Sequence, residues 1–291
     1  MASFQSTKIN PDRFHFSQMK FLLILIPLSA FMILPIVFIF SQSLKPIGEL
    51  FLYPPRFFVE NPTLQNFVDL FKQTSVTVIP MTRYLFNSIV VAAVVVFFSV
   101  TMTAMAGFAL SKLDFKLRKI IFEANTIALM FVPVAVQIPR YFIVDKLGLT
   151  DGLLGHIFPL LAIPVGLFLI KQFIDQIPDE LLEAAAIDGA STFYIFRRII
   201  VPMVMPALAT VAILAFQQTW NNTETSELFV NPESLKTFAF YMSTLAGEVD
   251  NQVAGRGMAA AAALLMFVPN LIIFVFLQSK VIDTMAHSGL K

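Results

Sequence analysis

The sequence predicts an all-α, polytopic membrane protein, and three observations support this prediction. Of the 291 residues, 57% are hydrophobic and only 13% are charged, and the mean hydropathy is +0.77. A soluble domain usually has about 25% charged residues, and this much apolar surface does not fit inside one soluble core. The apolar residues form six runs, and a helix of about 20 apolar residues crosses the hydrocarbon core of a membrane. A soluble enzyme, a disordered chain and a coiled coil are therefore excluded.

The six expected spans follow one another between residues 21 and 277. The first carries no charge and no clear cleavage site follows it, so it is interpreted as a retained anchor and not as a signal peptide. The third holds one acidic residue, Glu123, and the fourth is short and contains Pro159 and Pro164. The expected spans are 21–40, 85–110, 120–139, 153–170, 201–220 and 258–277.

The distribution of Lys and Arg sets the expected orientation, because cytoplasmic loops carry more of these residues. With a cytoplasmic N-terminus, the inner segments hold 12 Lys and Arg in 73 residues, and the outer segments hold 8 in 94. The N-terminal segment 1–20 and the tail 278–291 are therefore expected in the cytoplasm. Outside, an amphipathic helix is expected at 64–71, and the segment 221–257 is acidic.

Composition also limits the chemistry. The sequence has no Cys, which excludes disulfides, thiolate catalysis and Cys-ligated metals. Its three His are scattered, and His156 and His287 have no ligand-like neighbours, so neither a metal site nor a catalytic residue is expected. The net charge of +1 gives no indication of nucleic acid as a partner. The P-loop motif is absent, so the chain itself is not expected to hydrolyse ATP.

One inner loop, 171–200, is long and is typical of two short helices. Pro178 fits the first turn of a helix, and Asp179 follows it at the positive end of the helix dipole. Gly189 can adopt the left-handed conformation that ends a helix, and Ser191 can cap a second one. The loop therefore predicts a helix–turn–helix on the cytoplasmic face of the membrane.

The same loop carries a longer motif. Glu183-Ala184-Ala185 is followed after three residues by Gly189, and after nine more by Ile199-Ile200-Val201-Pro202. This order resembles the EAA loop of ABC importer permeases, E-A-A-x3-G-x9-I-x-L-P, with Val201 in place of the usual Leu. Asp188 and Ala190, on either side of the glycine, also match the D-G-A sequence that is common in the family. The alternative is an ordinary interfacial amphipathic helix, but such helices carry no fixed Gly and Pro spacing.

The similarity extends over roughly residues 14–291. The segments that begin at Tyr84, Ala106, Val132 and Thr219 look like the carbohydrate-uptake branch, and the chain is similar to its six-span, maltose-type smaller permease. The resemblance implies a multi-pass protein of the bacterial cytoplasmic membrane, forming half of a heterodimeric pore within membrane lipid. The implied partners are a second permease subunit, an ABC ATPase dimer that holds ATP and Mg, an extracytoplasmic sugar-binding protein, and a sugar or oligosaccharide substrate.

The resemblance also implies roles for residues, none of them catalytic, and no cofactor bound by this chain. Glu183 would dock in a groove of the ATPase, the small residues after it would allow close approach, and the glycine would supply the turn. The implied ATPase-coupling residues are Glu183, Ala184, Ala185, Asp188, Gly189 and Pro202.

Polar and aromatic residues at the outer ends of two spans are candidates for substrate contacts, because aromatic faces and amides bind sugars. These candidates are Asn87, Trp220, Asn221 and Asn222. For Trp220, a place in an interfacial aromatic belt is an equally weighted alternative.

The sequence leaves three other functions open. An ion-coupled secondary transporter would use Glu123 as its coupling acid, although snorkelling toward Arg118 and Lys119 also explains this residue. A polytopic membrane enzyme lacks a recognisable catalytic pair. An ABC importer for a polyamine, phosphate or peptide would share the loop, and only the resemblance to the carbohydrate branch argues against it.

Overall fold

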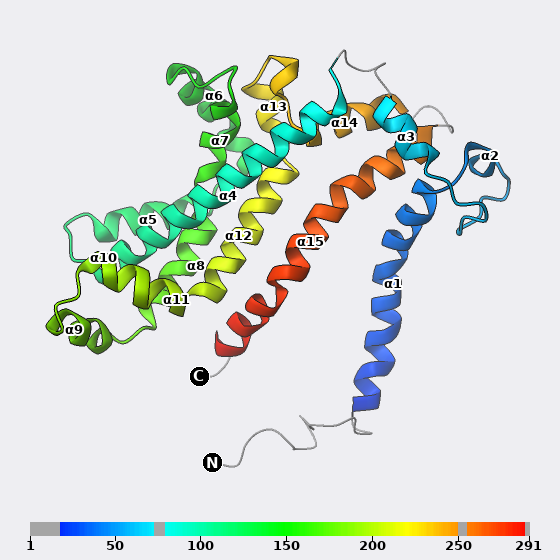
Figure 1. The fold of residues 1–291 in the computed structure, drawn as a ribbon. Helices are drawn as coiled ribbons and strands as arrows, with labels where there is room; N and C mark the ends of the chain where they lie inside the picture. Colours follow the sequence, from blue (N-terminus) through cyan, green and yellow to red (C-terminus); the bar gives the residue numbers. More distant parts are fainter. Residues whose placement is uncertain (1–17, 73–78, 250–254, 289–291) are drawn as a thin grey trace. The chain divides into compact units, whose positions relative to one another are not determined.

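The computed structural model describes residues 18–72, 79–249 and 255–288. These residues form helices and turns with no β-strand among them, so the all-α prediction is confirmed (Figure 1). The chain divides into two compact units, residues 1–72 with 249–264 and residues 73–248 with 265–291. Parts of the two predicted cytoplasmic ends, 1–17 and 289–291, lie outside the described residues.

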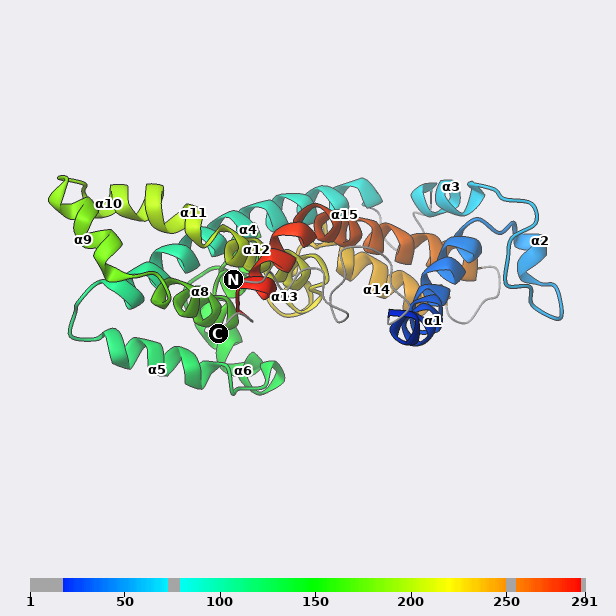
Figure 2. The ribbon, with the colours of Figure 1, turned by 90° about the horizontal axis from the view of Figure 1, so that it is seen from below.

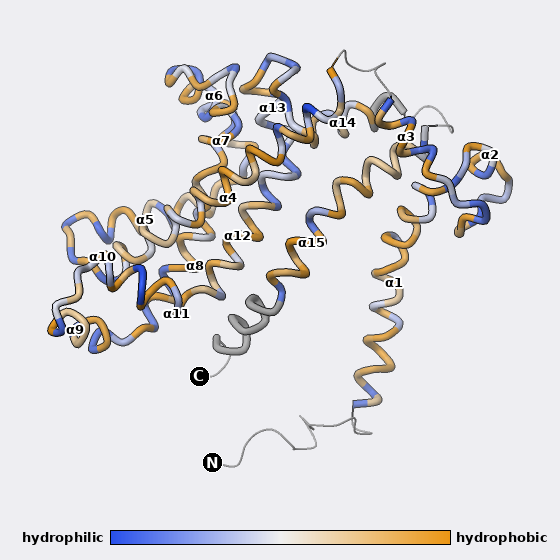
Figure 3. The backbone as a smooth tube through the Cα atoms, viewed as in Figure 1, coloured by the Kyte–Doolittle hydropathy of each residue, from blue (hydrophilic) through white to orange (hydrophobic). Residues whose placement is uncertain are grey.

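The first unit is formed by α1 (Met19–Ser43), α2 (Ile47–Leu50), α3 (Gln65–Lys72) and the first turns of α15 (Arg256–Ser288). Figure 3 shows α1 as apolar along most of its length, and none of its most apolar stretch is buried. Phe21, Leu23 and Phe31 are among its exposed side chains. Since water solvates such a surface unfavourably, α1 requires lipid or another protein chain around it.

Polar bonds hold the segment between α1 and α3. The carboxylate of Glu49 accepts the backbone N–H groups of residues 60–61, at 3.1 and 2.8 Å. The amide of Asn66 on α3 donates to two carbonyl oxygens in residues 43–45, at 2.8 and 2.7 Å. Gly257 lies so close to Asn66 that a Cβ there would be 2.5 Å from its Oδ1. The helix α3 matches the amphipathic helix predicted at 64–71.

The second unit is built along α4 (Met81–Lys112), a helix of 32 residues. Both α8 (Pro164–Asp175) and α12 (Met205–Trp220) pack against it (Figures 1 and 2). Gly107 lets α8 come close to α4, because a Cβ at this position would lie 2.6 Å from Cγ2 of Ile170. One buried apolar cluster joins the three helices and includes Ala104, Phe108, Ile170, Ile174, Val204, Ala207, Leu208 and Val211.

Shorter elements complete the second unit, together with α15 from residue 265 onward. They are α5 (Arg118–Ala128), η2 (Pro133–Val136), α6 (Gln137–Lys146), α7 (Leu153–Leu161), α9 (Asp179–Ile187), α10 (Thr192–Ile195), η3 (Phe196–Ile200), α11 (Val201–Met203), α13 (Glu224–Leu228), η4 (Glu233–Leu235) and α14 (Phe238–Val249).

Three described helices, α1, α4 and α15, are long and apolar enough to cross a membrane, and there are up to six spans if each bent helix pair counts as one. The expected spans 21–40, 85–110 and 258–277 each lie inside one of these helices. The other three expected ranges each contain a bend. The bends are 115° between α5 and η2–α6, 42° between α7 and α8, and 80° between α10–α11 and α12.

Proline residues explain these three bends, which cannot be recognised from the number of apolar residues in each expected span. Pro133 begins η2, Pro164 begins α8 and Pro206 is the second residue of α12. Each lacks the N–H group that would continue the preceding helix, and its ring disfavours a helical residue before it. With 11 residues, α5 is about 16 Å long, roughly half of the hydrocarbon thickness. The range 120–139 is therefore not a straight span.

Candidate functional site

The first helix of the long inner loop is α9. Pro178 precedes it in an extended conformation, with φ −58° and ψ 137°, so the helix starts at Asp179 and not at the proline. The sequence predicts Pro178 in the first turn of the helix, and in the structure it is the N-cap residue directly before that turn. Asp179 and Glu180 occupy the first turn, where carboxylates interact favourably with the unpaired N–H groups.

The turn after α9 is a Schellman motif. Gly189 has φ +84°, which is the left-handed conformation predicted for it. The N–H groups of Gly189 and of the next residue donate to the carbonyl oxygens of Ala186 and Ala185, each at 3.0 Å, and thereby satisfy the end of the helix. Ser191 then caps α10, as predicted, and its Oγ accepts the N–H of Tyr194 at 3.3 Å.

The helix α9 has one packed face and one exposed face. Leu182 and Ala185 pack against the buried cluster, which contains Ile177, Ile195 and Ile200 as well as residues of α4, α8 and α12. The side chains on the other side are exposed, and that of Ile187 is 86% exposed. We name this surface the α9 face, and it consists of Glu183, Ala184, Ile187 and Asp188. Beside it, a hollow of about 540 Å³ is lined by Ala185, Asp188, Gly189, Ala190, Ser191 and Tyr194.

A bent segment joins α9 to α12. It runs through α10, the π-helical turn η3 and α11, and then turns by 80°. Pro202 lies in α11 and Pro206 near the start of α12, so two N–H groups are missing at the bend. Ile195 and Ile200 of this segment belong to the same buried cluster as Leu182. A displacement of α9 therefore either carries α12 with it or disrupts a shared core.

Two of the substrate-path candidates bond to other parts of the chain. Asn87 is buried, and its Nδ2 donates to the carbonyl oxygens of Ser234 and Lys236 at 3.0 and 2.9 Å. The Oδ1 of Asn222 accepts the N–H of Thr225 at 2.9 Å, at the start of α13. These bonds hold the segment between α12 and α14 in place.

The other two candidates lie at the end of α12. Trp220 is 4% exposed, its Nε1 donates to the carbonyl oxygen of Met266 at 3.1 Å, and its ring stacks on Phe216. Asn221 is exposed, and its Nδ2 donates to the carbonyl oxygen of Gln217 at 2.9 Å. Among the four candidates, Asn221 alone has an exposed side chain, and its contact with a substrate stays a prediction.

Sequence reasoning missed the structural role of His156. Its ring is fully buried, with Nδ1 2.8 Å from Oγ1 of Thr225 and Nε2 3.1 Å from the carbonyl oxygen of Leu235. These partners lie 69 and 79 residues away along the chain, so no local pattern relates them. Among the residues that the structure describes, no group of three or more His, Asp or Glu could hold a metal ion.

The second unit thus consists of bent apolar helix pairs around the long helix α4, with a helix–turn–helix packed on their shared buried cluster. The chain belongs to the family of binding-protein-dependent transport system inner membrane components, which matches residues 18–279. It is thus a transport permease, as the motif of the inner loop predicts.

Several relatives have names that state what they transport. The chain is 28% identical to the arabinooligosaccharides transport system permease protein AraQ of Bacillus subtilis, over 91% of this chain and 92% of that protein. It is 26% identical to the trehalose transport system permease protein SugB of Mycobacterium tuberculosis, over 89% and 92%. A chain from the crystal structure of a bacterial ABC transporter for the acidic polysaccharide alginate has the same fold, with a TM-score of 0.76, 18% identity and coverage of 92% and 99%.

Proposed function

We propose that this chain is the smaller permease of an ABC importer for a sugar or oligosaccharide. It forms half of a heterodimeric pore with a second permease and receives its solute from an extracytoplasmic binding protein. Energy comes from a separate ABC ATPase dimer, which holds ATP and Mg and docks on the α9 face. The relatives named for arabinooligosaccharides and trehalose support the carbohydrate class.

The observation that carries the proposed coupling is the two-sided character of α9. Its outer side exposes Glu183, Ala184 and Ile187, while its inner side packs through Leu182 and Ala185 against the buried cluster, with α10 as its main helical neighbour. A partner that binds the exposed side therefore acts on α4, α8 and α12 through α10 and the close-packed cluster that these elements share. Alternating access of the pore would follow from this motion, as a rigid-body movement of helices around a fixed path.

The proposed orientation places the α9 face and both termini in the cytoplasm. The excess of Lys and Arg in the inner segments supports it, with 12 of the 20 basic residues in 73 positions. The segment between α12 and α14, which Asn87 and His156 hold by hydrogen bonds, then faces the opposite side. We propose this segment as part of the docking surface for the binding protein.

The test is ATP hydrolysis by the purified assembly of this chain with its companion permease and ATPase. Binding protein and a panel of saccharides are added to the wild type and to Glu183→Arg. We expect one saccharide class to stimulate hydrolysis severalfold, and Glu183→Arg to abolish the stimulation because it reverses the charge at the docking position. Glu180→Arg is the matched control, since it makes the same change one turn earlier on the same helix.

Two outcomes would contradict the proposal. If Glu183→Arg assembles and retains full saccharide stimulation, α9 is not the coupling element. If saccharides fail to stimulate while a polyamine, phosphate or peptide does, the substrate class is wrong and the importer class stands.

An ion-coupled transporter is the second candidate, and Glu123 is its only acid within an expected span. In the structure Glu123 is 59% exposed, and its Oε1 lies 3.8 Å from Nζ of Lys119. An exposed pair near a helix start fits snorkelling better than ion coupling. We expect Glu123→Gln to leave uptake unchanged, and uptake that persists without the ATPase but is lost in Glu123→Gln would reverse this conclusion.

A further inference from the structure

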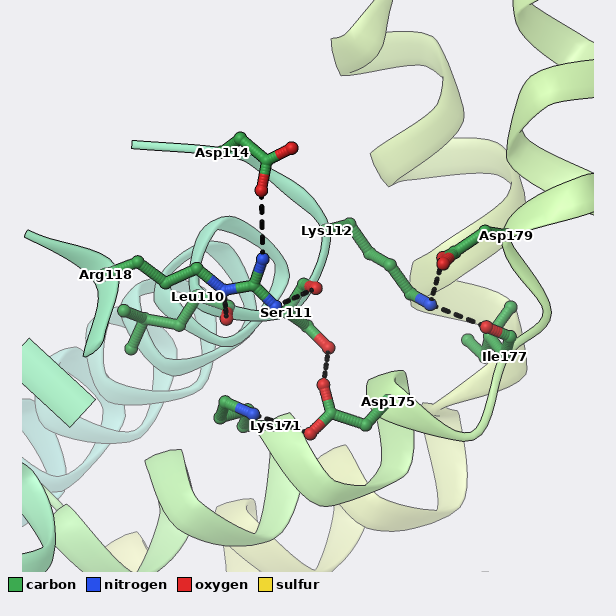
Figure 4. Close-up of polar contacts among 9 residues, drawn as sticks. All are labelled: Leu110, Ser111, Lys112, Asp114, Arg118, Lys171, Asp175, Ile177 and Asp179. Atoms are coloured by element: carbon green, nitrogen blue, oxygen red, sulfur yellow. Dashed lines mark hydrogen bonds and ion pairs between the residues drawn. The ribbon is translucent and has the colours of Figure 1, made fainter. Parts of the chain in front are cut away.

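A polar network beside α9 joins the ends of four helices (Figure 4). Lys112 is the last residue of α4, and its Nζ donates to the carbonyl oxygen of Ile177 and to Oδ1 of Asp179, both at 2.6 Å. The Lys112 side chain is 7% exposed, whereas that of Asp179 is 73% exposed. A buried ammonium group needs such acceptors, because its lost hydration is otherwise uncompensated. Both acceptors lie where the chain enters α9.

A second connection ties α8 to α4. Asp175, the last residue of α8, accepts a hydrogen bond from the hydroxyl of Ser111 with one oxygen and pairs with Nζ of Lys171 at 2.6 Å with the other. The same Nζ lies 4.5 Å from the centre of the Phe122 ring on α5. The carboxylate at the end of α8 is thus connected to α4 directly and to α5 through Lys171.

Arg118, the first residue of α5, completes the network. Its Nε and Nη2 donate to the carbonyl oxygens of Leu110 and Ser111, at 2.8 and 2.7 Å. Its Nη1 lies 3.2 Å from Oδ1 of Asp114. The last carbonyl groups of a helix have no donor within the helix, so Arg118 supplies donors for the end of α4. The turn that presents Lys112 is thereby fixed.

We propose that Lys112 is a positioning residue that fastens the first turn of α9 to α4, so that α4, α8 and α9 move as one body. This inference rests on the proposed role of α9 in coupling. The helix α9 is then held at two points along its axis, by Lys112 at its start and by Leu182 and Ala185 farther along. Two separated attachments prevent a rotation that either one alone allows.

The chemistry of the two attachments differs in a way that suits this role. Apolar contacts such as those of Leu182 are non-directional and permit sliding. Hydrogen bonds from an ammonium group to a carboxylate and a carbonyl weaken steeply when their geometry changes. The short link at residues 176–178 joins α8 to α9, and Lys112 prevents this link from acting as a hinge.

The first test compares Lys112→Met with the wild type in the full assembly. We expect solute transported per ATP hydrolysed to fall about tenfold, the effect of losing one charge-assisted hydrogen bond, while ATP hydrolysis continues. Lys112→Arg keeps N–H donors at this position, so we expect it to retain most of the wild-type solute transport per ATP. Lys116→Met is the matched control, since Lys116 is an exposed lysine of the same turn. The melting temperature of each assembly is measured alongside.

The second test measures the motion directly. The chain has no cysteine, so spin labels attach only at Thr101→Cys on α4 and Glu180→Cys on α9, both exposed positions. We expect one narrow distance distribution with and without ATP in the wild type, and a broadened one in Lys112→Met.

The outcomes separate the positioning role of Lys112 from the coupling role of α9. The inference about Lys112 is overturned if Lys112→Met changes neither the solute transported per ATP nor the distance distribution. It is also overturned if Lys112→Met lowers the melting temperature but leaves the solute transported per ATP unchanged, because this result indicates a structural role alone. If Glu183→Arg also leaves coupling intact, the proposed coupling role of α9 fails. The spin-label distances test the attachment of α9 in either case.

Discussion

At Gly107 the helices α4 and α8 approach closely, so a side chain added at this position tests the packed core. A Cβ at this position would lie 2.6 Å from Cγ2 and 3.3 Å from Cβ of Ile170. Carbon atoms pack best about 3.5–4.0 Å apart, so the first contact is roughly 1 Å too short. Ile170 is fully buried and branched at Cβ, so it cannot move this methyl group aside by rotating a flexible chain end.

The expected magnitude follows from two opposing terms. Overpacking a close-packed core costs about 1–3 kcal/mol. Replacing Gly by Ala inside a helix contributes about 1 kcal/mol in the stabilising direction. Gly107→Ala should therefore destabilise the protein by about 1 kcal/mol. Ile170→Leu removes the clashing methyl group at nearly constant volume, so the double variant should recover most of this loss, with a coupling energy of about 1 kcal/mol.

The assay is thermal unfolding of the purified permease assembly for the two single variants and the double variant. Gly48→Ala is the control, because no heavy atom lies within 4 Å of a Cβ at that position and the helix-propensity gain stands alone. The reasoning is refuted if Gly107→Ala is as stable as Gly48→Ala, or if Ile170→Leu does not rescue it.

The remaining predictions concern the turn after α9 and the outer segment. Gly189→Val should reduce saccharide-stimulated ATP hydrolysis more than Gly189→Asn, because the left-handed conformation costs a β-branched residue about 1–2 kcal/mol and Asn less. An equal effect of both variants would contradict this. Asn87→Leu should lower stability by about 1–3 kcal/mol, since the carbonyl oxygen of Lys236 loses its donor whereas that of Ser234 keeps Nε of Arg83, with unfolding temperature as the measurement. Trp220→Phe should cost about 1 kcal/mol and leave the saccharide dependence unchanged, and a large change in the saccharide concentration for half-maximal stimulation would instead assign Trp220 to the substrate path.

The local parts of the site could be predicted because each depends on residues close together in sequence. The left-handed turn at Gly189 and the cap at Ser191 follow from backbone sterics and from the pairing of helix ends within four residues. Pro178 lies just before the helical turn in which it was predicted, because it adopts the extended conformation of an N-cap residue. Such a shift leaves the exposed face of α9 unchanged.

The long-range parts could not be predicted, because they depend on which helices meet. Lys112, Asp175 and His156 each find their partners across more than 60 residues of chain. A single sequence shows these groups only as isolated polar residues near helix ends. The bends at Pro164 and Pro206 were visible as prolines, but hydropathy alone does not distinguish a kinked span from two helices at 80°.

The positions of the acidic residues bear on where energy enters the transporter. An acid that stores energy as a bound proton must be buried in the membrane, where ionisation is costly. An acid that docks a partner must instead be exposed and must be attached firmly to what it moves. Glu183 meets the second requirement, because it is exposed on a helix whose first turn bonds to Lys112 and whose inner side packs against the buried cluster. The network at the end of α4 therefore matters as much as the exposed motif, since a docking residue on a loose helix would transmit no displacement to the pore.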